Sequence, residues 1–309
     1  MHAAFLQVAL QIAQPAPARR SRVGAEAWTY VTRERVIVVA PTRLSVIRAV
    51  ARPNLPPMHA VICMKRGPDT TAKVKPAANG RGIDPQGVEF IISPYDEMAI
   101  ERAIQLQEAG VVKKTTVVCL GPKDASKELR KALAMGADEA VHIVEDRDFR
   151  DPLATAECLA AALRDLKPDL VLCGWKAIDD DSAAVGGMLA EKLGFGYASF
   201  VVKLDAAAGA ASVTVHREVE GATEIVEVPM PCVVTVQKGL AEARFASLKG
   251  IMAAKKKPLA EKAPAAAEGA SDLVALKPPP ARPPGKLLGQ GAAAVPELVR
   301  VLRDEVHVL

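Results

Sequence analysis

The sequence predicts an α/β fold: a doubly wound parallel sheet with appended β strands and a C-terminal arm. Between residues 58 and 194, short β-branched runs alternate with longer segments of helical periodicity. This rhythm is typical of parallel strands covered by helices on both faces. Beyond Gly196, four short β runs with turn signals between them add strands to the same domain. A chain of 309 residues, half of them apolar, is long enough for a sizeable core.

Cap and turn residues set the limits of these elements. Ser93 at the N-cap, Pro94 at the first helical position and acids in the first turn begin a helix that Gly110 ends. A turn signal at 79–80 predicts a short β excursion before this helix. We expect strands over 60–64, 115–120, 139–144 and 169–174, further helices over 125–135, 154–166 and 181–193, and appended strands over 198–204, 211–217, 223–228 and 232–236.

Residues 1–57 differ in composition from the rest of the chain. They hold eight Arg and two acids, a balance of +6, whereas the whole chain carries +4, so residues 58–309 carry −2. The Arg-rich segment has three interpretations: a mitochondrial targeting peptide, a genuine extra arm, or translation upstream of a true start at Met58. We expect an N-terminal extension over 1–57, disordered or a mis-called start, ahead of an α/β domain over 58–257.

The C-terminal part of the chain has a different composition again. Seven of the 23 prolines lie within 258–286, which predicts a flexible Pro/Ala-rich linker. An amphipathic helix within 287–309 is too short to be stable alone, so we expect it to dock on this protein or on a partner. No stretch reaches the roughly 18 consecutive apolar residues of a membrane span, and we expect no direct membrane insertion.

Several chemistries lack the residues that they need. The five cysteines lie far apart without a CxxC pair, which excludes a zinc ribbon and indicates a reducing compartment. The five histidines have no ligand spacing, and none of the common hydrolase, P-loop, zincin or GxGxxG motifs occurs. The nearly neutral domain also argues against a nucleic-acid partner. We therefore expect no catalytic residue, no metal site and no nucleic-acid site.

One edge of the predicted sheet gathers the unusual residues. The stretch 174–185 follows a buried strand, 93–96 begins a helix, and Cys63 and Leu120 lie at the ends of two other strands. Ligands of open α/β sheets bind at the carboxyl ends of strands, and free N–H groups at a helix start favour phosphate. Gly186 would allow close backbone approach. Helix capping is the plain alternative for the three aspartates, and a Mg²⁺ site is a weaker one.

The segment 240–257 follows the last strand and mixes apolar residues with charge. It is either a solvated helix whose basic end suits a C-terminus or a segment that docks a partner.

Six stretches in order make residues 58–257 resemble the beta subunit of electron transfer flavoprotein. They are VICMKR (61–66), SPYDE (93–97), ALAMGAD (132–138), DLVLCG (169–174), AIDDD (177–181) and LKGIMAAKKK (248–257). The resemblance implies a fold of adenine-nucleotide-binding type, and a subunit that carries electrons without being an enzyme. It also implies an alpha subunit as partner, which holds most of a shared FAD, and a C-terminal helix that docks on it.

The resemblance assigns the sheet edge to AMP and the later segment to partners. Its electron donors would be acyl-CoA dehydrogenases and other flavin dehydrogenases, and its acceptor the membrane-bound electron transfer flavoprotein-quinone oxidoreductase. The family's docking loop corresponds to 238–252, with Leu240 as apolar anchor beside Glu242 and Arg244; Glu218 matches an acid that orients the flavin domain. The AMP contacts fall on Cys63, Ser93, Pro94, Tyr95, Asp96, Leu120, Gly174, Trp175, Lys176, Ala177, Ile178, Asp179, Asp180, Asp181, Ser182, Ala183, Ala184 and Val185.

Two alternatives stay open. Electron-bifurcating relatives hold a second FAD in place of AMP, but they resemble Ile-Asp-Gly-Asp where Asp180 stands here, which favours AMP. A stand-alone nucleotide-sensing protein of universal-stress type would share the fold without needing a docking segment. The resemblance implies a cytoplasmic protein in a bacterium, or one in the mitochondrial matrix if 1–57 is a transit peptide.

Overall fold

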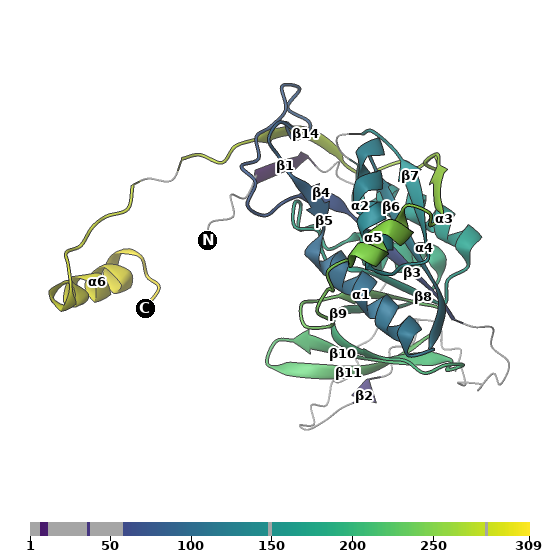
Figure 1. Ribbon diagram of the computed structural model, residues 1–309. Coiled ribbons are helices and arrows are strands. Elements are labelled where there is room, and N and C mark those ends of the chain that lie inside the picture. The colour runs from purple at the N-terminus through teal and green to yellow at the C-terminus, as the bar shows by residue number, and fades with distance from the viewer. Residues whose placement is uncertain (1–6, 12–35, 38–57, 148–149, 282–283) are drawn as a thin grey trace, which may run out of the picture.

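The computed structural model describes residues 7–11, 36–37, 58–147, 150–281 and 284–309 (Figure 1). Most of the predicted N-terminal extension therefore lies outside the described residues. Within it the structure places two short strands, β1 (Gln7–Gln11) and β2 (Val36–Ile37).

A ten-stranded sheet forms the body of the molecule and confirms the predicted α/β fold. Its strand order is β13-β7-β6-β3-β8-β12-β9-β10-β11-β2, and the pairings from β13 to β9 are all parallel. β10 runs antiparallel to both of its neighbours. The strands are β3 (Met58–Met64), β6 (Val112–Gly121), β7 (Glu139–Val144), β8 (Leu170–Gly174), β9 (Gly196–Asp205), β10 (Ser212–Val219), β11 (Ala222–Pro229), β12 (Cys232–Val236) and β13 (Leu259–Lys262).

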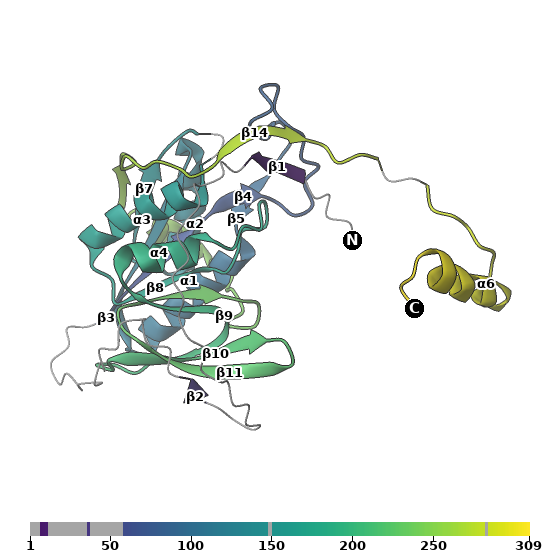
Figure 2. The same cartoon turned by 180° about the vertical axis from the view of Figure 1, so that it is seen from behind.

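Helices cover both faces of this sheet (Figures 1 and 2). One core lies beneath α1 and α2, and the other lies beneath α3 and α4. The central strand β3 has neighbouring residues in both cores: Ile62 packs into the first and Val61 into the second. A continuously apolar strand is expected for a parallel sheet buried on both faces. The helices are α1 (Pro94–Glu108), α2 (Ser126–Met135), α3 (Pro152–Leu166), α4 (Val185–Leu193) and α5 (Leu248–Ala254), with a short 3-10 turn, η1 (Lys123–Ala125), before α2.

The Pro-rich segment differs from the expected linker. It contains β13, which extends the sheet beside β7, and β14 (Asp272–Lys277), which pairs with β1. The stretches between the prolines are long enough for single strands of four and six residues, although the average composition of 258–286 gives no sign of them. The β excursion predicted at 79–80 is present as a bridge between Pro76 and Ile83, next to the hairpin of β4 (Arg66–Pro68) and β5 (Phe90–Ile92).

The C-terminal helix forms as predicted. α6 (Val295–Arg300) follows a short turn, η2 (Ala292–Ala294), and continues into a π-helical turn, η3 (Val301–Glu305). Figures 1 and 2 show it standing away from the sheet at the end of an extended chain. Apolar side chains on it are exposed, including Val295 and Leu298, as is Leu309 beyond it.

Candidate functional site

The ends of three neighbouring strands, β6, β3 and β8, form the candidate site together with the start of α1. Cys63 near the end of β3 is in register with Cys173 of β8, and Met64 is in register with Cys119 of β6. The structure thus brings together the strand ends and the helix start that the sequence assigned to one edge.

Asp96 braces this edge. Its side chain is buried and accepts hydrogen bonds from the backbone N–H of Lys65 (2.8 Å) and of Gly174 (2.6 Å). A single carboxylate on α1 therefore joins the ends of β3 and β8. Burial raises the pKa of Asp96 to about 7, although both N–H groups favour its ionised form. A Cβ on Gly174 would lie 2.7 Å from the Cβ of Tyr95, so this crossing requires glycine.

The three aspartates do not lie in the first turn of a helix, contrary to the predicted helix over 181–193. α4 begins only at Val185, because Asp181 and Ala183 both adopt a left-handed backbone with φ of 51°. The aspartates lie in the loop that joins β8 to α4. Lys65 Nζ contacts Asp179 (2.8 Å) and Asp180 (2.9 Å), and Lys176 Nζ contacts Asp181 (2.8 Å). Two lysines therefore pair with the three carboxylates and offset two of their three negative charges.

Ser93 is the N-cap residue of α1 as predicted, but its hydroxyl does not cap the helix. The Ser93 side chain is fully buried, and its Oγ has no hydrogen-bond partner among the described residues. The indole Nε1 of Trp175 is likewise buried without a partner there. Buried polar atoms are normally paired, so two unpaired ones at one sheet edge favour a ligand that would supply the partners.

Three aromatic rings lie in contact beside this edge. Trp175 packs edge-on to Tyr95 (5.7 Å between centroids) and against Phe200 (4.5 Å). Phe200 lies in β9 with φ of 58°, an uncommon conformation for a bulky residue. The Lys176 ammonium lies 4.7 Å from the Trp175 ring centroid, within cation–π range.

Gly186 has a packing role, and the ligand approach expected there stays a prediction. A Cβ on Gly186 would lie 2.3 Å from the Cγ2 of Thr235 on β12. Glycine is therefore required where α4 crosses the sheet.

The predicted docking residues lie elsewhere, after β12. Leu240 is half-buried and packs against the first core, whereas Glu242 is exposed. Arg244 binds within the chain: its guanidinium donates to Glu101 (2.7 Å) and Glu108 (2.6 Å) of α1. The following apolar residues are strongly exposed, above all Phe245 (100%), Leu248 (84%) and Met252 (63%). Glu218 lies exposed on β10, apart from this segment.

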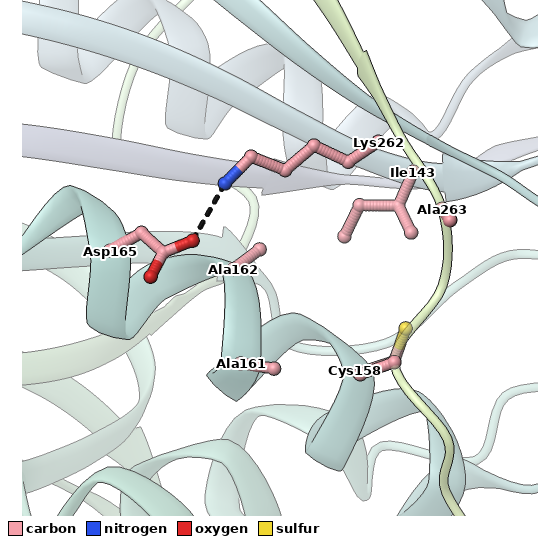
Figure 3. Close-up of a pocket in the computed structure, with 8 residues that line it drawn as sticks. Ile143, Cys158, Ala161, Ala162, Asp165, Lys262 and Ala263 are labelled. Atoms are coloured by element: carbon pink, nitrogen blue, oxygen red, sulfur yellow. Dashed lines mark hydrogen bonds and ion pairs between the residues drawn. The ribbon is translucent and has the colours of Figure 1, made fainter.

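A pocket of about 200 Å³ lies away from these residues, between α3 and the chain around β13 (Figure 3). Lys262 and Asp165 pair beside it (2.7 Å), and none of the predicted site residues lines it. Within the described parts of the chain, no cluster of His, Cys, Asp or Glu has metal-binding geometry, and no helix is long and apolar enough to cross a membrane.

Sequence reasoning missed two residues that shape these sites, Lys65 and Glu101. Lys65 directly follows the first strand, which was the available signal for its place at the edge. Glu101 carries no such signal, because its partner Arg244 lies 143 residues further on.

The fold and this site together define an α/β protein in which Asp96 joins the carboxyl ends of β3 and β8; we call this site the braced edge. Proteins of this architecture bind ligands at the carboxyl ends of their strands. Comparison with known proteins gives the family. The electron transfer flavoprotein domain matches residues 81–267. The chain belongs to the electron transfer flavoprotein family, whose members are electron transport proteins, as its sequence resemblance indicated.

Individual relatives match nearly the whole domain. Electron transfer flavoprotein subunit beta of Syntrophomonas wolfei is 38% identical over 252 residues, which cover 81% of this chain and 98% of the relative. The subunit beta of Bacillus subtilis is 40% identical over 264 residues, covering 82% and 100% of the two chains. Protein FixA of Azotobacter vinelandii is 38% identical over 207 residues, covering 64% and 72%.

Proposed function

We propose that this chain is the beta subunit of a heterodimeric electron transfer flavoprotein. It would carry electrons from acyl-CoA and other flavin dehydrogenases to a membrane quinone oxidoreductase, through FAD held mainly by the alpha subunit. The observation that carries this proposal is the match to relatives named subunit beta over almost their full length. FAD, when bound, supplies the redox chemistry, and this chain supplies scaffold and docking surfaces.

The braced edge is the proposed AMP site. AMP offers acceptors on its ring, ribose and phosphate, which suit the unpaired Ser93 hydroxyl and Trp175 N–H. Ion pairs with Lys65 and Lys176 offset two of the three aspartate charges and so weaken the repulsion that an anionic phosphate would otherwise meet. The strand-end residues Cys63 and Leu120, the start of α1, and the loop over 174–185 would hold the nucleotide.

Two further surfaces would bind proteins. The segment 238–252 presents Phe245, Leu248 and Met252 to solvent, and Arg244 ties it to α1. Large exposed apolar side chains gathered in one segment are typical of an interaction site. α6 is amphipathic and stands away from the sheet, so it would dock on the alpha subunit (Figure 2).

Co-expression with the alpha subunit tests the assembly. A yellow 1:1 complex is expected, and a colourless monomer would contradict the proposal. Two FAD per heterodimer would instead establish the bifurcating alternative, and an AMP-bound protein without any partner would establish the nucleotide sensor.

The docking segment is tested by electron transfer from a reduced acyl-CoA dehydrogenase to the complex. Leu240→Ala and Phe245→Ala should each slow the transfer without loss of flavin. Val274→Ala is a matched control, because Val274 is an exposed apolar residue outside the segment. Unchanged rates in both docking variants would overturn the docking role.

A further inference from the structure

Lys65 occupies a particular place at the braced edge. It is the first residue after β3, and its ammonium reaches across to the loop between β8 and α4. There it contacts Asp179 and Asp180 at 2.8 and 2.9 Å. One lysine thus forms ion pairs with two carboxylates that lie more than a hundred positions away in the sequence.

The backbone of Lys65 is fixed from two sides. Its N–H donates to Asp96 (2.8 Å), and its carbonyl accepts from the N–H of Ser93 (3.0 Å). The Lys65 side chain therefore starts from a rigid point, next to the buried Ser93 hydroxyl that has no partner among the described residues. Burial alone would lower the pKa of Lys65, but the two aspartates outweigh it and raise that pKa, so the ammonium stays charged.

These ion pairs add to two backbone hydrogen bonds of the loop, from Trp175 N–H to the Val236 carbonyl and from Asp181 N–H to the Ala177 carbonyl. The loop is not helical, and Asp181 and Ala183 adopt left-handed backbone conformations. Within the loop, the Asp179 carboxylate accepts only from the neighbouring Asp180 N–H, and the Asp180 carboxylate from the Ser182 N–H. Removal of Lys65 would leave the Asp179 and Asp180 carboxylates without a cation.

We propose that Lys65 is a positioning residue of the nucleotide site, which acts through Asp179 and Asp180. Its charge offsets one of their two negative charges, so that an anionic phosphate meets less repulsion at this edge. This inference rests on the proposed function, since it concerns the same site. It assigns to Lys65 no contact with the nucleotide itself.

The test measures AMP affinity by titration calorimetry on the nucleotide-depleted complex of the full chain with its alpha subunit. Lys65→Met should weaken AMP binding by about tenfold or more, since one further uncompensated negative charge then lies near the phosphate. Lys65→Arg should bind AMP within about threefold of wild type, because it keeps the charge. Lys203→Met is the control: Lys203 pairs with Asp205 in an equally simple ion pair outside the site and should leave affinity unchanged.

A triple variant separates neutralisation from a merely structural brace. Lys65→Met combined with Asp179→Asn and Asp180→Asn should recover most of the lost affinity, because the repelling charges are gone. The loss in Lys65→Met alone should also shrink at high salt, which screens charge but repairs no fold. Thermal unfolding of each variant shows that the complex is folded.

The outcomes are distinct. Wild-type affinity in Lys65→Met would overturn the role of Lys65. A folded triple variant that still binds AMP weakly would also overturn it, because it would show Lys65 to be a direct ligand or a simple brace. A wild-type complex that takes up no AMP would contradict the proposed function itself, whatever Lys65 does.

Discussion

Gly186 and Gly187 are neighbours in α4, yet they should respond oppositely to alanine. A Cβ at 186 would lie 2.3 Å from Thr235 Cγ2 and 3.4 Å from Cys173 Sγ. A Cβ at 187 would lie 3.6 Å from the ring of Tyr197, an ordinary contact. Carbon atoms pack at about 3.5–4.0 Å, so only the first substitution forces something to move by more than about 1 Å.

The surroundings of Gly186 have little room to move. Thr235 is buried in β12, which is hydrogen-bonded between β8 and β9. Overpacking of this kind costs about 1–3 kcal/mol, so Gly186→Ala should destabilise the protein by that amount. Gly187→Ala should stabilise it by about 0.5–1 kcal/mol, because alanine is the better helix former.

Denaturant unfolding of the two variants beside wild type measures both changes. Thr235→Ser removes the clashing methyl group, so the double variant with Gly186→Ala should recover at least part of the loss. A stable Gly186→Ala would refute the packing explanation. If that stable variant also failed to bind AMP, Gly186 would be a ligand-approach glycine after all.

Three further predictions concern single side chains. Burial raises the pKa of Asp96 to about 7, so between about pH 4 and 7 the folded state holds a proton that the unfolded state releases. The free energy of unfolding should therefore fall over this range by at most about 1.4 kcal/mol per pH unit. Urea unfolding of wild type and Asp96→Asn at several pH values isolates this slope as the difference between the two free energies. Ser93→Ala should leave the free energy of unfolding unchanged or raise it by about 1 kcal/mol, because the buried hydroxyl has no partner among the described residues. Titration calorimetry should show weaker AMP binding by the same variant. A large destabilisation would show instead that the hydroxyl has a structural role. Arg244→Met should lower the free energy of unfolding by about 1–3 kcal/mol, measured by thermal unfolding, because it leaves the buried Glu101 carboxylate without its cation. Limited proteolysis of the variant should then cut within 238–252. If variant and wild type resist the protease equally, Arg244 does not hold this segment.

Periodicity and caps predict the body of the fold well. The strand over 139–144 has the limits that the sequence predicts, and the helix begun by Ser93 and Pro94 starts where expected. These elements depend on local signals, namely β-branched runs, proline and glycine, which act within a few residues. The sheet edge is predictable for the same reason, because it consists of strand ends that such local signals mark.

Features set by distant partners escape such reasoning. Acids before Val185 suggest a helix start, but they lie in a loop, where Lys65 and Lys176 pair with them. Ser93 stands at the right cap position, although its hydroxyl caps nothing. At Gly186, the sequence gives no sign that the fold places Thr235 against the glycine. The aspartate loop and Gly186 thus involve tertiary contacts that local signals do not reveal, whereas the Ser93 hydroxyl has no partner among the described residues.

The nucleotide content of the purified heterodimer tests the central claim most directly. Release of bound nucleotides by denaturation, followed by chromatography and mass spectrometry, counts FAD and AMP per complex. One FAD and one AMP per heterodimer is the predicted result. A complex that holds no adenine nucleotide besides FAD, or one that holds two FAD, would contradict the assignment of the braced edge to AMP.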